Sequence, residues 1–170
     1  MISINWSGKN LSGDLDISGV TSLAELNCSK NQLCSLVVRN NTSLCRLHCD
    51  DNQLSNLDVS NNTSLTSLWC AGNQLTSLDV SKNTLLESLE YSENQLSSLD
   101  VSNNISLVWL GCIKNQLTRL DVNKNTLLSQ LMCSENQLTS LDLTNNTEME
   151  YLYCDNNVTV TGHDPRVVSN

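Results

Sequence analysis

Two short stretches of the chain carry residue types that could do catalytic chemistry. His48 directly precedes Cys49, and a histidine beside a cysteine is the pairing that generates a nucleophilic thiolate. Glu87 and Glu90 lie three residues apart, where two carboxyl groups could act as general acid and general base. The only other histidine is His163.

The local sequence pattern argues against both constellations. Leu47-x-Cys49 has a period of two, which predicts a strand with one buried face, so His48 points outward while Cys49 points inward. An open sheet has no pocket that would raise the pKa of a carboxyl group. We therefore expect a non-enzymatic protein without catalytic residues and without a cofactor.

The cysteines are the next residues that could bind a metal or form cross-links. Six of the eight occupy one inward repeat position, where a cysteine behaves as a small apolar side chain. They lack the CxxC pairs of zinc sites, and side chains that point the same way from parallel strands suit a disulfide poorly. Cys34 and Cys45 lie outside this column and are expected to stay unpaired. The column is Cys28, Cys49, Cys70, Tyr91, Cys112, Cys133 and Cys154.

A column of aspartates recurs in the second half of the repeat. Carboxylates about 4.8 Å apart repel each other. Three arrangements would relieve this repulsion. The carboxylates could accept hydrogen bonds from Ser and Thr hydroxyls or from backbone amides, they could turn apart into water, or they could share cations such as calcium. We favour the first two arrangements. We expect no metal site, because the sequence lacks the Gly-rich Asp loops of calcium-binding rolls. Cations shared along the column remain the third hypothesis. The column is Asp16, Asp58, Asp79, Asp100, Asp121 and Asp142.

One repeated pattern must position all of these residues. Leu-x-x-Leu-x-Cys-x-x-Asn-Gln-Leu-x-x-Leu-Asp-Val-x-x-Asn returns every 21 residues from Leu23 to Asn146 without an insertion. A fixed period of this length indicates a solenoid in which each repeat contacts only its neighbours. The Leu-x-Cys and Leu-x-Val segments are predicted as short stacked strands. We therefore expect a mainly β fold with a parallel sheet, short strands or extended turns on the second side, and little or no helix.

Two columns of asparagine accompany the strands. A buried Asn amide at a strand end can bond to the backbone of its own turn and of the next turn. We therefore interpret these columns as structural spines and not as binding residues. The first is Asn31, Asn52, Asn73, Asn94, Asn115, Asn136 and Asn157; the second is Asn41, Asn62, Asn83, Asn104, Asn125 and Asn146.

The motifs resemble those of the leucine-rich repeat family. Residues 44–54 match its conserved segment, Leu-x-x-Leu-x-Cys-x-x-Asn-x-Leu, and residues 54–62 match most of the same formula again. A 21-residue unit that nests two half-motifs is similar to the bacterial IRREKO class of these repeats. The resemblance implies a right-handed solenoid with its parallel sheet on the concave face. It also implies a secreted or cell-surface location and recognition through the concave strands.

The repeat boundaries divide a single domain, residues 1–170, into three parts. Residues 1–20 are predicted to be a degenerate N-terminal cap repeat, and residues 21–146 six regular repeats. Residues 147–170 are predicted to be a partial repeat with a C-terminal cap or tail. The sequence fits either a whole protein or part of a longer one.

Apolar residues near both ends are expected to close the core. Ile2, Ile4 and Trp6 are predicted to cover the first core layer. Residues 158–162 are predicted to form a final strand before Pro165.

Charge and hydropathy restrict the partners. The net charge of −9 argues against nucleic acid and against anionic membrane surfaces. No apolar run is long enough to span a bilayer. No signal peptide begins the chain, although a chain whose export signal had been removed would begin in the same way. We expect a monomer, with end-to-end association through open sheet edges as the alternative.

The outward positions of the first half-repeat vary, whereas those of the second half are nearly uniform. Exposed Trp, Tyr and Met are typical of protein interfaces, and Trp and Tyr also stack on sugar rings. Acidic side chains rim this face. The predicted ligand-binding residues are Arg46, His48, Trp69, Glu90, Trp109, Ile113, Met132, Tyr151 and Tyr153.

The sequence thus favours a binding module that recognises a protein, or alternatively a glycan, through this face. A second hypothesis is a structural spacer or stalk of a larger surface or secreted protein, with no ligand of its own. A third is a solenoid stabilised by cations along its Asp column.

Overall fold

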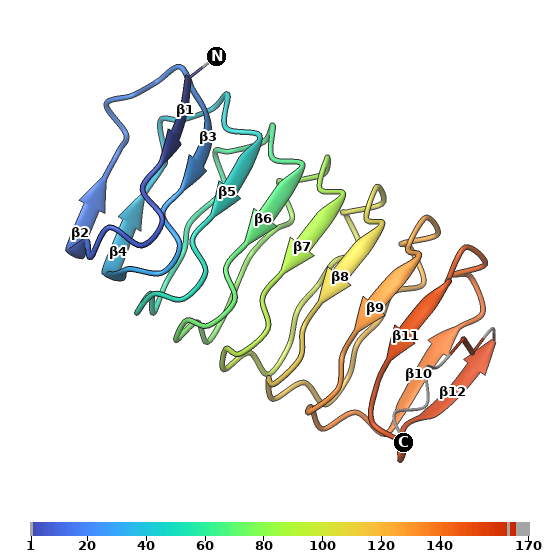
Figure 1. Ribbon diagram of the computed structural model, residues 1–170. Coiled ribbons are helices and arrows are strands. Elements are labelled where there is room, and N and C mark those ends of the chain that lie inside the picture. The colour runs from blue at the N-terminus through green and yellow to red at the C-terminus, as the bar shows by residue number, and fades with distance from the viewer. Residues whose placement is uncertain (1, 163, 166–170) are drawn as a thin grey trace.

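Each coil of the chain adds one short strand to a parallel sheet of eight strands (Figure 1). The computed structural model of the protein describes residues 2–162 and 164–165. Within these residues no helix is long and apolar enough to cross a membrane. In spatial order the strands are β1 (Ile2–Asn5), β3 (Leu23–Asn27), β5 (Arg46–His48), β6 (Ser67–Trp69), β7 (Ser88–Glu90), β8 (Trp109–Gly111), β9 (Gln130–Met132) and β11 (Tyr151–Tyr153).

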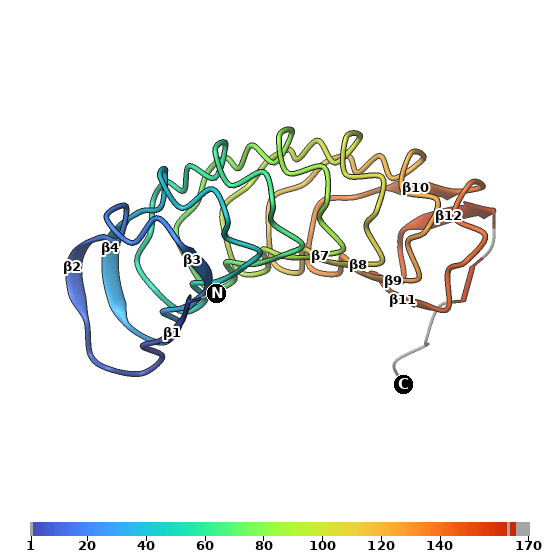
Figure 2. The ribbon, with the colours of Figure 1, turned by 90° about the horizontal axis from the view of Figure 1, so that it is seen from above.

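The second half of each coil is extended and pairs as strands only near the two ends of the stack. There β2 (Ser12–Asp16) pairs with β4 (Gln32–Val37), and β10 (Ser140–Leu143) pairs with β12 (Thr159–Gly162). This confirms the predicted combination of short strands and extended turns. Figure 2 shows the eight-stranded sheet on the inner side of a shallow arc, which is the concave side predicted for it.

The register of the sheet follows the register of the sequence repeat. Leu47 lies opposite Leu68, and Leu68 lies opposite Leu89, so this repeat position forms one buried column through the stack. The Cys and Val positions form further buried columns, and together they make one continuous core. Tyr91 takes the place of a cysteine in its coil and is also fully buried.

Side chains of the first asparagine column bond to the backbone of their own coil and of a neighbouring coil. The neighbour is the preceding coil, whereas the sequence analysis predicted the next one. The side-chain amide of Asn73 donates to the carbonyls of Cys70 and Ala71 in its own coil. It also donates to the carbonyl of Cys49 in the coil before. The side-chain oxygen of Asn73 accepts a bond of 2.9 Å from the backbone N–H of Leu54, also in the coil before.

The second asparagine column makes fewer bonds. The side-chain amide of Asn83 donates to the carbonyls of Val59 and Asn62, at 3.0 and 2.9 Å, in the preceding coil. Its side-chain oxygen is buried and has no hydrogen-bond partner among the described residues. The same holds for Asn41, Asn62, Asn104, Asn125 and Asn146.

The turn after the Cys position takes a left-handed residue in most coils, which the repeat pattern did not predict. In six coils this residue has φ between 53° and 61°, and only one of the six is a glycine. Such a φ is uncommon for other residue types, so the stacked turns hold the backbone in a locally strained conformation. The six are Lys30, Asp51, Gly72, Glu93, Lys114 and Glu135.

The N-terminal end corrects one prediction. Ile4 packs half-buried against the core, as expected, but Ile2 and Trp6 are 41% and 36% exposed and do not cover the first core layer. A shift of register between Ile2 and Ser3 interrupts the pairing of β1 with β3, so the alternation of inward and outward side chains fails there.

The C-terminal end agrees with the prediction. Val158 is buried, and β12 forms the predicted final strand. His163 and residues 166–170, which the sequence places in the tail, lie outside the described residues.

Candidate functional site

The side chains on either side of each buried Leu form two rows along the inner side of the sheet, which we call the concave face. Neighbours within a row lie opposite one another in the strand register. One row is Glu25, Arg46, Ser67, Ser88, Trp109, Gln130 and Tyr151; the other is Asn27, His48, Trp69, Glu90, Gly111, Met132 and Tyr153.

Three aromatic rings follow one another across the concave face. The imidazole of His48 stacks on the indole of Trp69, with ring centroids 4.5 Å apart and planes 12° apart. The indole of Trp109, two coils further along, has its centroid 6.3 Å from that of Trp69 and is tilted by 39°. Trp69 Nε1–H donates to the hydroxyl of Ser88 at 3.0 Å, which helps to fix the orientation of the ring.

A hollow of about 360 Å³ lies between the two indoles and is lined by Trp69, Ser88, Glu90 and Trp109. Gly111 makes room for these side chains. A Cβ atom at this position would clash with the carboxylate of Glu90 and would lie 2.6 Å from Trp109 Cη2. The carboxylate and the indole therefore lie directly over the glycine backbone.

The carboxylate of Glu90 is half-buried in this hollow. The backbone N–H of Ser92 donates to its Oε1 atom at 2.8 Å. Burial nevertheless raises the pKa of Glu90 above its ordinary value, because the hydrogen bonds from Ser92 only partly offset the loss of water. The negative charges of Asp50 and Glu93 act in the same direction as burial.

Two further groups beside the aromatic rings are shifted by burial. Burial raises the pKa of Asp50, although the Ser29 hydroxyl and the Ala71 backbone N–H donate to its carboxylate at 3.0 and 3.1 Å. Burial also lowers the pKa of His48, which favours the uncharged imidazole against Trp69.

The stacked coils are similar to solved structures of leucine-rich repeat domains. The functional domain of InlJ from Listeria monocytogenes is 34% identical to this chain and superimposes with a TM-score of 0.82. The match covers 95% of this chain and 40% of that one, and the InlJ domain includes a cysteine ladder. The chain is a leucine-rich repeat protein of the bacterial type.

Two more distant likenesses concern the fold alone. Internalin C2 from Listeria monocytogenes is 18% identical, with a TM-score of 0.84 over 96% of this chain and 74% of that one. An octameric complex of latrophilin 3, Unc5D and the leucine-rich repeat part of FLRT2 gives 24% identity and a TM-score of 0.67, over 84% and 55% of the two chains. No protein-family model matches the sequence. No curated protein matches it significantly.

The six thiols of the cysteine column belong to the core of this leucine-rich repeat protein. His48 faces the concave side while Cys49 is fully buried, so the two side chains point to opposite faces of the strand, as predicted. Burial raises the pKa of Cys112 to about 12 and that of Cys49 well above its ordinary value. The described residues include all eight cysteines and form no disulfide; Cys34 is exposed and Cys45 half-buried.

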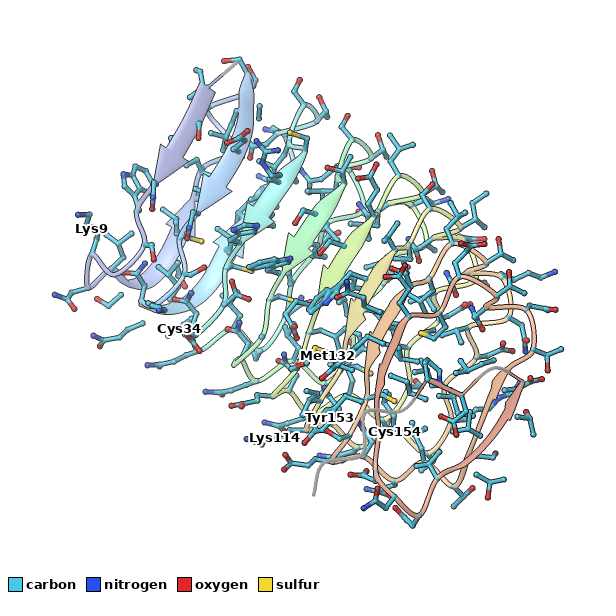
Figure 3. All side chains as sticks on the ribbon, turned by 45° about the vertical axis from the view of Figure 1, so that its right-hand side comes forward. Lys9, Cys34, Lys114, Met132, Tyr153 and Cys154 are labelled. Atoms are coloured by element: carbon cyan, nitrogen blue, oxygen red, sulfur yellow. The ribbon has the colours of Figure 1, made fainter. Side chains whose placement is uncertain are left out.

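The predicted residues at the C-terminal end share the concave face with the hollow. Met132 and Tyr153 lie opposite each other on β9 and β11, and Figure 3 shows them on neighbouring strands of the sheet. Tyr151 lies on β11 in the other row. Ile113 is half-buried just beyond β8, where its backbone N–H donates to the hydroxyl of Ser92.

Two features of the concave face were not evident from the sequence. Arg46 forms an ion pair with Glu25 in the neighbouring coil, so its charge is balanced within the chain. The position directly after each Cys position, which holds Ile113 in one coil, varies like the outward positions, but Ser29 and Ser134 are buried there. The strand alternation ends at this position, where the chain bends into the left-handed turn.

The sequence analysis missed an apolar edge beside the concave strands. Leu85, Ile105, Val108 and Leu127 are 52%, 59%, 42% and 52% exposed, and they lie in three successive coils where the chain enters β7, β8 and β9. Leu85 and Leu127 occupy the repeat position that holds Ser106 in the coil between them. An apolar residue at a repeat position that is otherwise polar was the signal in the sequence from which this edge could have been predicted.

The opposite side of the coils carries the Asp column, whose charges are stabilised locally. The backbone N–H of Ser60 donates to Asp58 at 3.0 Å, and that of Ser81 donates to Asp79 at 2.9 Å. Hydrogen bonds from these serines lower the pKa of both aspartates. This is the first of the three arrangements considered from the sequence. No cluster of three or more metal-ligating side chains occurs in the described part of the chain.

Proposed function

We propose that this leucine-rich repeat chain is a non-enzymatic module that binds another protein through its concave face. The observation that carries the proposal is the pair of indoles on either side of the hollow, with Trp69 40% exposed. Trp is enriched among the residues that dominate interface energies. A rigid sheet holds both rings in place before binding, which lowers the entropic cost of association.

The apolar edge supports a partner of protein size. The edge of Leu85, Ile105, Val108 and Leu127 lies in the coils of β7, β8 and β9, and Trp109 of the indole pair begins β8. Exposed apolar groups that gather in one place mark interaction sites. A partner that covers both features would bury more apolar surface than a ligand confined to the hollow.

The likenesses support the same proposal. The complex of latrophilin 3, Unc5D and FLRT2 contains a leucine-rich repeat domain among its protein components. The likeness to InlJ and internalin C2 supports a secreted or cell-surface bacterial protein, and we include that location in the proposal.

A glycan is the second candidate ligand. Trp69 and Trp109 could stack on sugar rings while Glu90 accepts bonds from sugar hydroxyls. The apolar edge favours a protein instead. A spacer without a ligand would leave the exposed indoles and the edge without a role.

The proposal is tested by capturing proteins from secreted and surface fractions on the immobilised chain. The variant Trp69→Ala/Trp109→Ala should capture at least about tenfold less of the recovered partner, a loss of about 1.4 kcal/mol or more. A matched variant on the opposite side, Ser77→Ala/Ser98→Ala, should capture as much as the wild type. Equal capture by the indole variant, with unchanged melting, would show that the concave face is the wrong surface.

A further inference from the structure

We propose that the hollow between Trp69 and Trp109 receives the guanidinium group of an arginine side chain from the partner protein. This inference depends on the function proposed above, because it assigns the chemistry of the group that the concave face recognises. It is carried by three features of the hollow: two aromatic walls, one carboxylate without a cationic partner, and a floor formed by a glycine.

The aromatic walls suit a flat cation. His48 covers one face of Trp69, and the strand order places the hollow on the other side of that indole. Trp109 is tilted by 39° to it with centroids 6.3 Å apart, and both rings line the hollow. A guanidinium stacks on the face of a Trp ring, and cation–π attraction is strongest for Trp.

The carboxylate in the hollow supplies the charge. Glu90 Oε1 accepts the Ser92 backbone N–H, whereas Oε2 lies over Gly111 beside the Trp109 ring. Three ion pairs are formed by the described residues, and none of them involves Glu90: Arg46–Glu25, Lys114–Glu93 and Arg119–Asp121. A half-buried carboxylate without a counter-charge is unfavourable, and a cation in the hollow would relieve this cost.

The charges around the hollow exclude an anionic ligand. Asp50 adds negative potential at Glu90, and the two neighbouring cations, Arg46 and Lys114, are paired with Glu25 and Glu93. The chain as a whole carries a net charge of −9. Complementarity of charge therefore favours a basic segment of the partner.

The shape favours arginine over lysine. An ammonium group is a compact, strongly hydrated point charge, whereas a guanidinium is planar and weakly hydrated. It can stack on an indole and donate to a carboxylate oxygen at its edge at the same time. In this hollow the carboxylate lies beside both indoles, so one guanidinium can make both kinds of contact.

The test is a titration of the ¹⁵N-labelled chain with the capped peptide acetyl-Gly-Arg-Gly-amide, followed by the indole N–H resonances. The three tryptophans of the sequence give three such signals. Trp69 and Trp109 should shift on titration, and Trp6, in the first coil, should not. Citrulline in place of arginine removes the charge but keeps the shape, and it should shift the two signals at least about tenfold less at equal concentration.

Two matched variants separate the charge from the fold. Glu90→Gln should weaken binding of the arginine peptide at least about fivefold, whereas Glu148→Gln, an exposed carboxylate at the C-terminal end of the stack, should not change it. Gly111→Ala should weaken binding as well, because the new Cβ displaces the carboxylate and the indole. A single cooperative melting transition shows that each variant folds.

Four outcomes would overturn the inference. The first two are shifts of the Trp69 and Trp109 signals that are as large with the citrulline peptide, or with a lysine peptide, as with the arginine peptide. The third is an unchanged affinity of Glu90→Gln for the arginine peptide. The fourth is a neutral oligosaccharide that shifts the two signals more than the arginine peptide does. Loss of partner capture in Trp69→Ala/Trp109→Ala, together with no response to arginine, would reject the arginine site and retain the proposed function. Capture that survives the double substitution would reject the proposed function itself.

Discussion

The imidazole of His48 lies parallel to the indole of Trp69, with ring centroids 4.5 Å apart. The two residues are opposite each other on neighbouring strands, so the stack is a cross-strand pair that the solenoid holds in place. It leaves only the other face of the indole free for a ligand. Together with the bond from Trp69 Nε1 to Ser88, the stack orients the ring before any partner arrives.

Removing the imidazole should therefore loosen Trp69. His48→Ala should shift the tryptophan emission to longer wavelength and lower the free energy of unfolding by about 0.5–1.5 kcal/mol, the range for a stacked aromatic pair. His48→Phe, which keeps a ring in place, is the matched control and should leave the emission unchanged. Identical spectra for all three proteins would mean that the stack does not hold the indole.

The two asparagine columns should differ in their contribution to stability. Asn73→Ala removes four hydrogen bonds to buried backbone groups, whereas Asn83→Ala removes two. We expect losses of about 3 and about 2 kcal/mol in the free energy of unfolding, measured by urea denaturation. The exposed Asn61→Ala should change it by less than about 0.5 kcal/mol. A larger loss at Asn83 than at Asn73 would contradict this assignment of bonds.

The pH dependence of stability should reveal the buried charge of Glu90. Burial raises the pKa of Glu90, so ionisation is less favourable in the folded chain than in the unfolded one. This destabilises the wild type at pH values above the raised pKa, and the effect is lost as the pH falls through that value towards 4.5. Glu90→Gln cannot ionise and should be more stable than the wild type at about pH 8, with a difference that shrinks towards about pH 4.

Denaturation curves at several pH values would measure this difference. A stability difference for Glu90→Gln that grows as the pH falls would have the wrong sign for a carboxyl group with a raised pKa.

Tyr91 interrupts the cysteine column and should respond differently to two substitutions. Its buried hydroxyl has no hydrogen-bond partner among the described residues other than the weakly bonding thiol of Cys112. Tyr91→Phe should therefore leave the free energy of unfolding unchanged or raise it by up to about 1 kcal/mol. Tyr91→Cys completes the column but leaves a cavity and should cost about 3 kcal/mol. A cost above about 1 kcal/mol for Tyr91→Phe would show that the hydroxyl is bonded.

The columns of the solenoid could be predicted because their positions repeat. Leu47, Leu68 and Leu89 recur in register, and a one-residue slip would turn every apolar side chain outward. The outward direction of His48 and the burial of Cys49 follow from the same alternation. The predicted sheet, core and buried asparagines of the middle coils are therefore confirmed. Asn157 in the last coil is exposed, and the cap residues Ile2 and Trp6, which do not repeat, were also placed wrongly.

The hollow could not be predicted in the same way. It depends on the tilt of Trp109 and on the space over Gly111, neither of which has a counterpart in the other coils. Arg46 and Glu25 form an ion pair between neighbouring coils, which a list of variable positions does not reveal. Side-chain orientation, and not the repeat, decides which outward residues meet.

The most direct test of the account is photocrosslinking between the chain and the partner recovered by capture. Benzoylphenylalanine would be placed at Gln130, an exposed position on the concave face between Trp109 and Tyr151, or at Ser98 on the opposite side. We predict a crosslinked adduct at Gln130 that is lost in Trp69→Ala/Trp109→Ala and is absent at Ser98. An adduct that forms equally at Ser98, or that persists when both indoles are removed, would contradict recognition by the concave face.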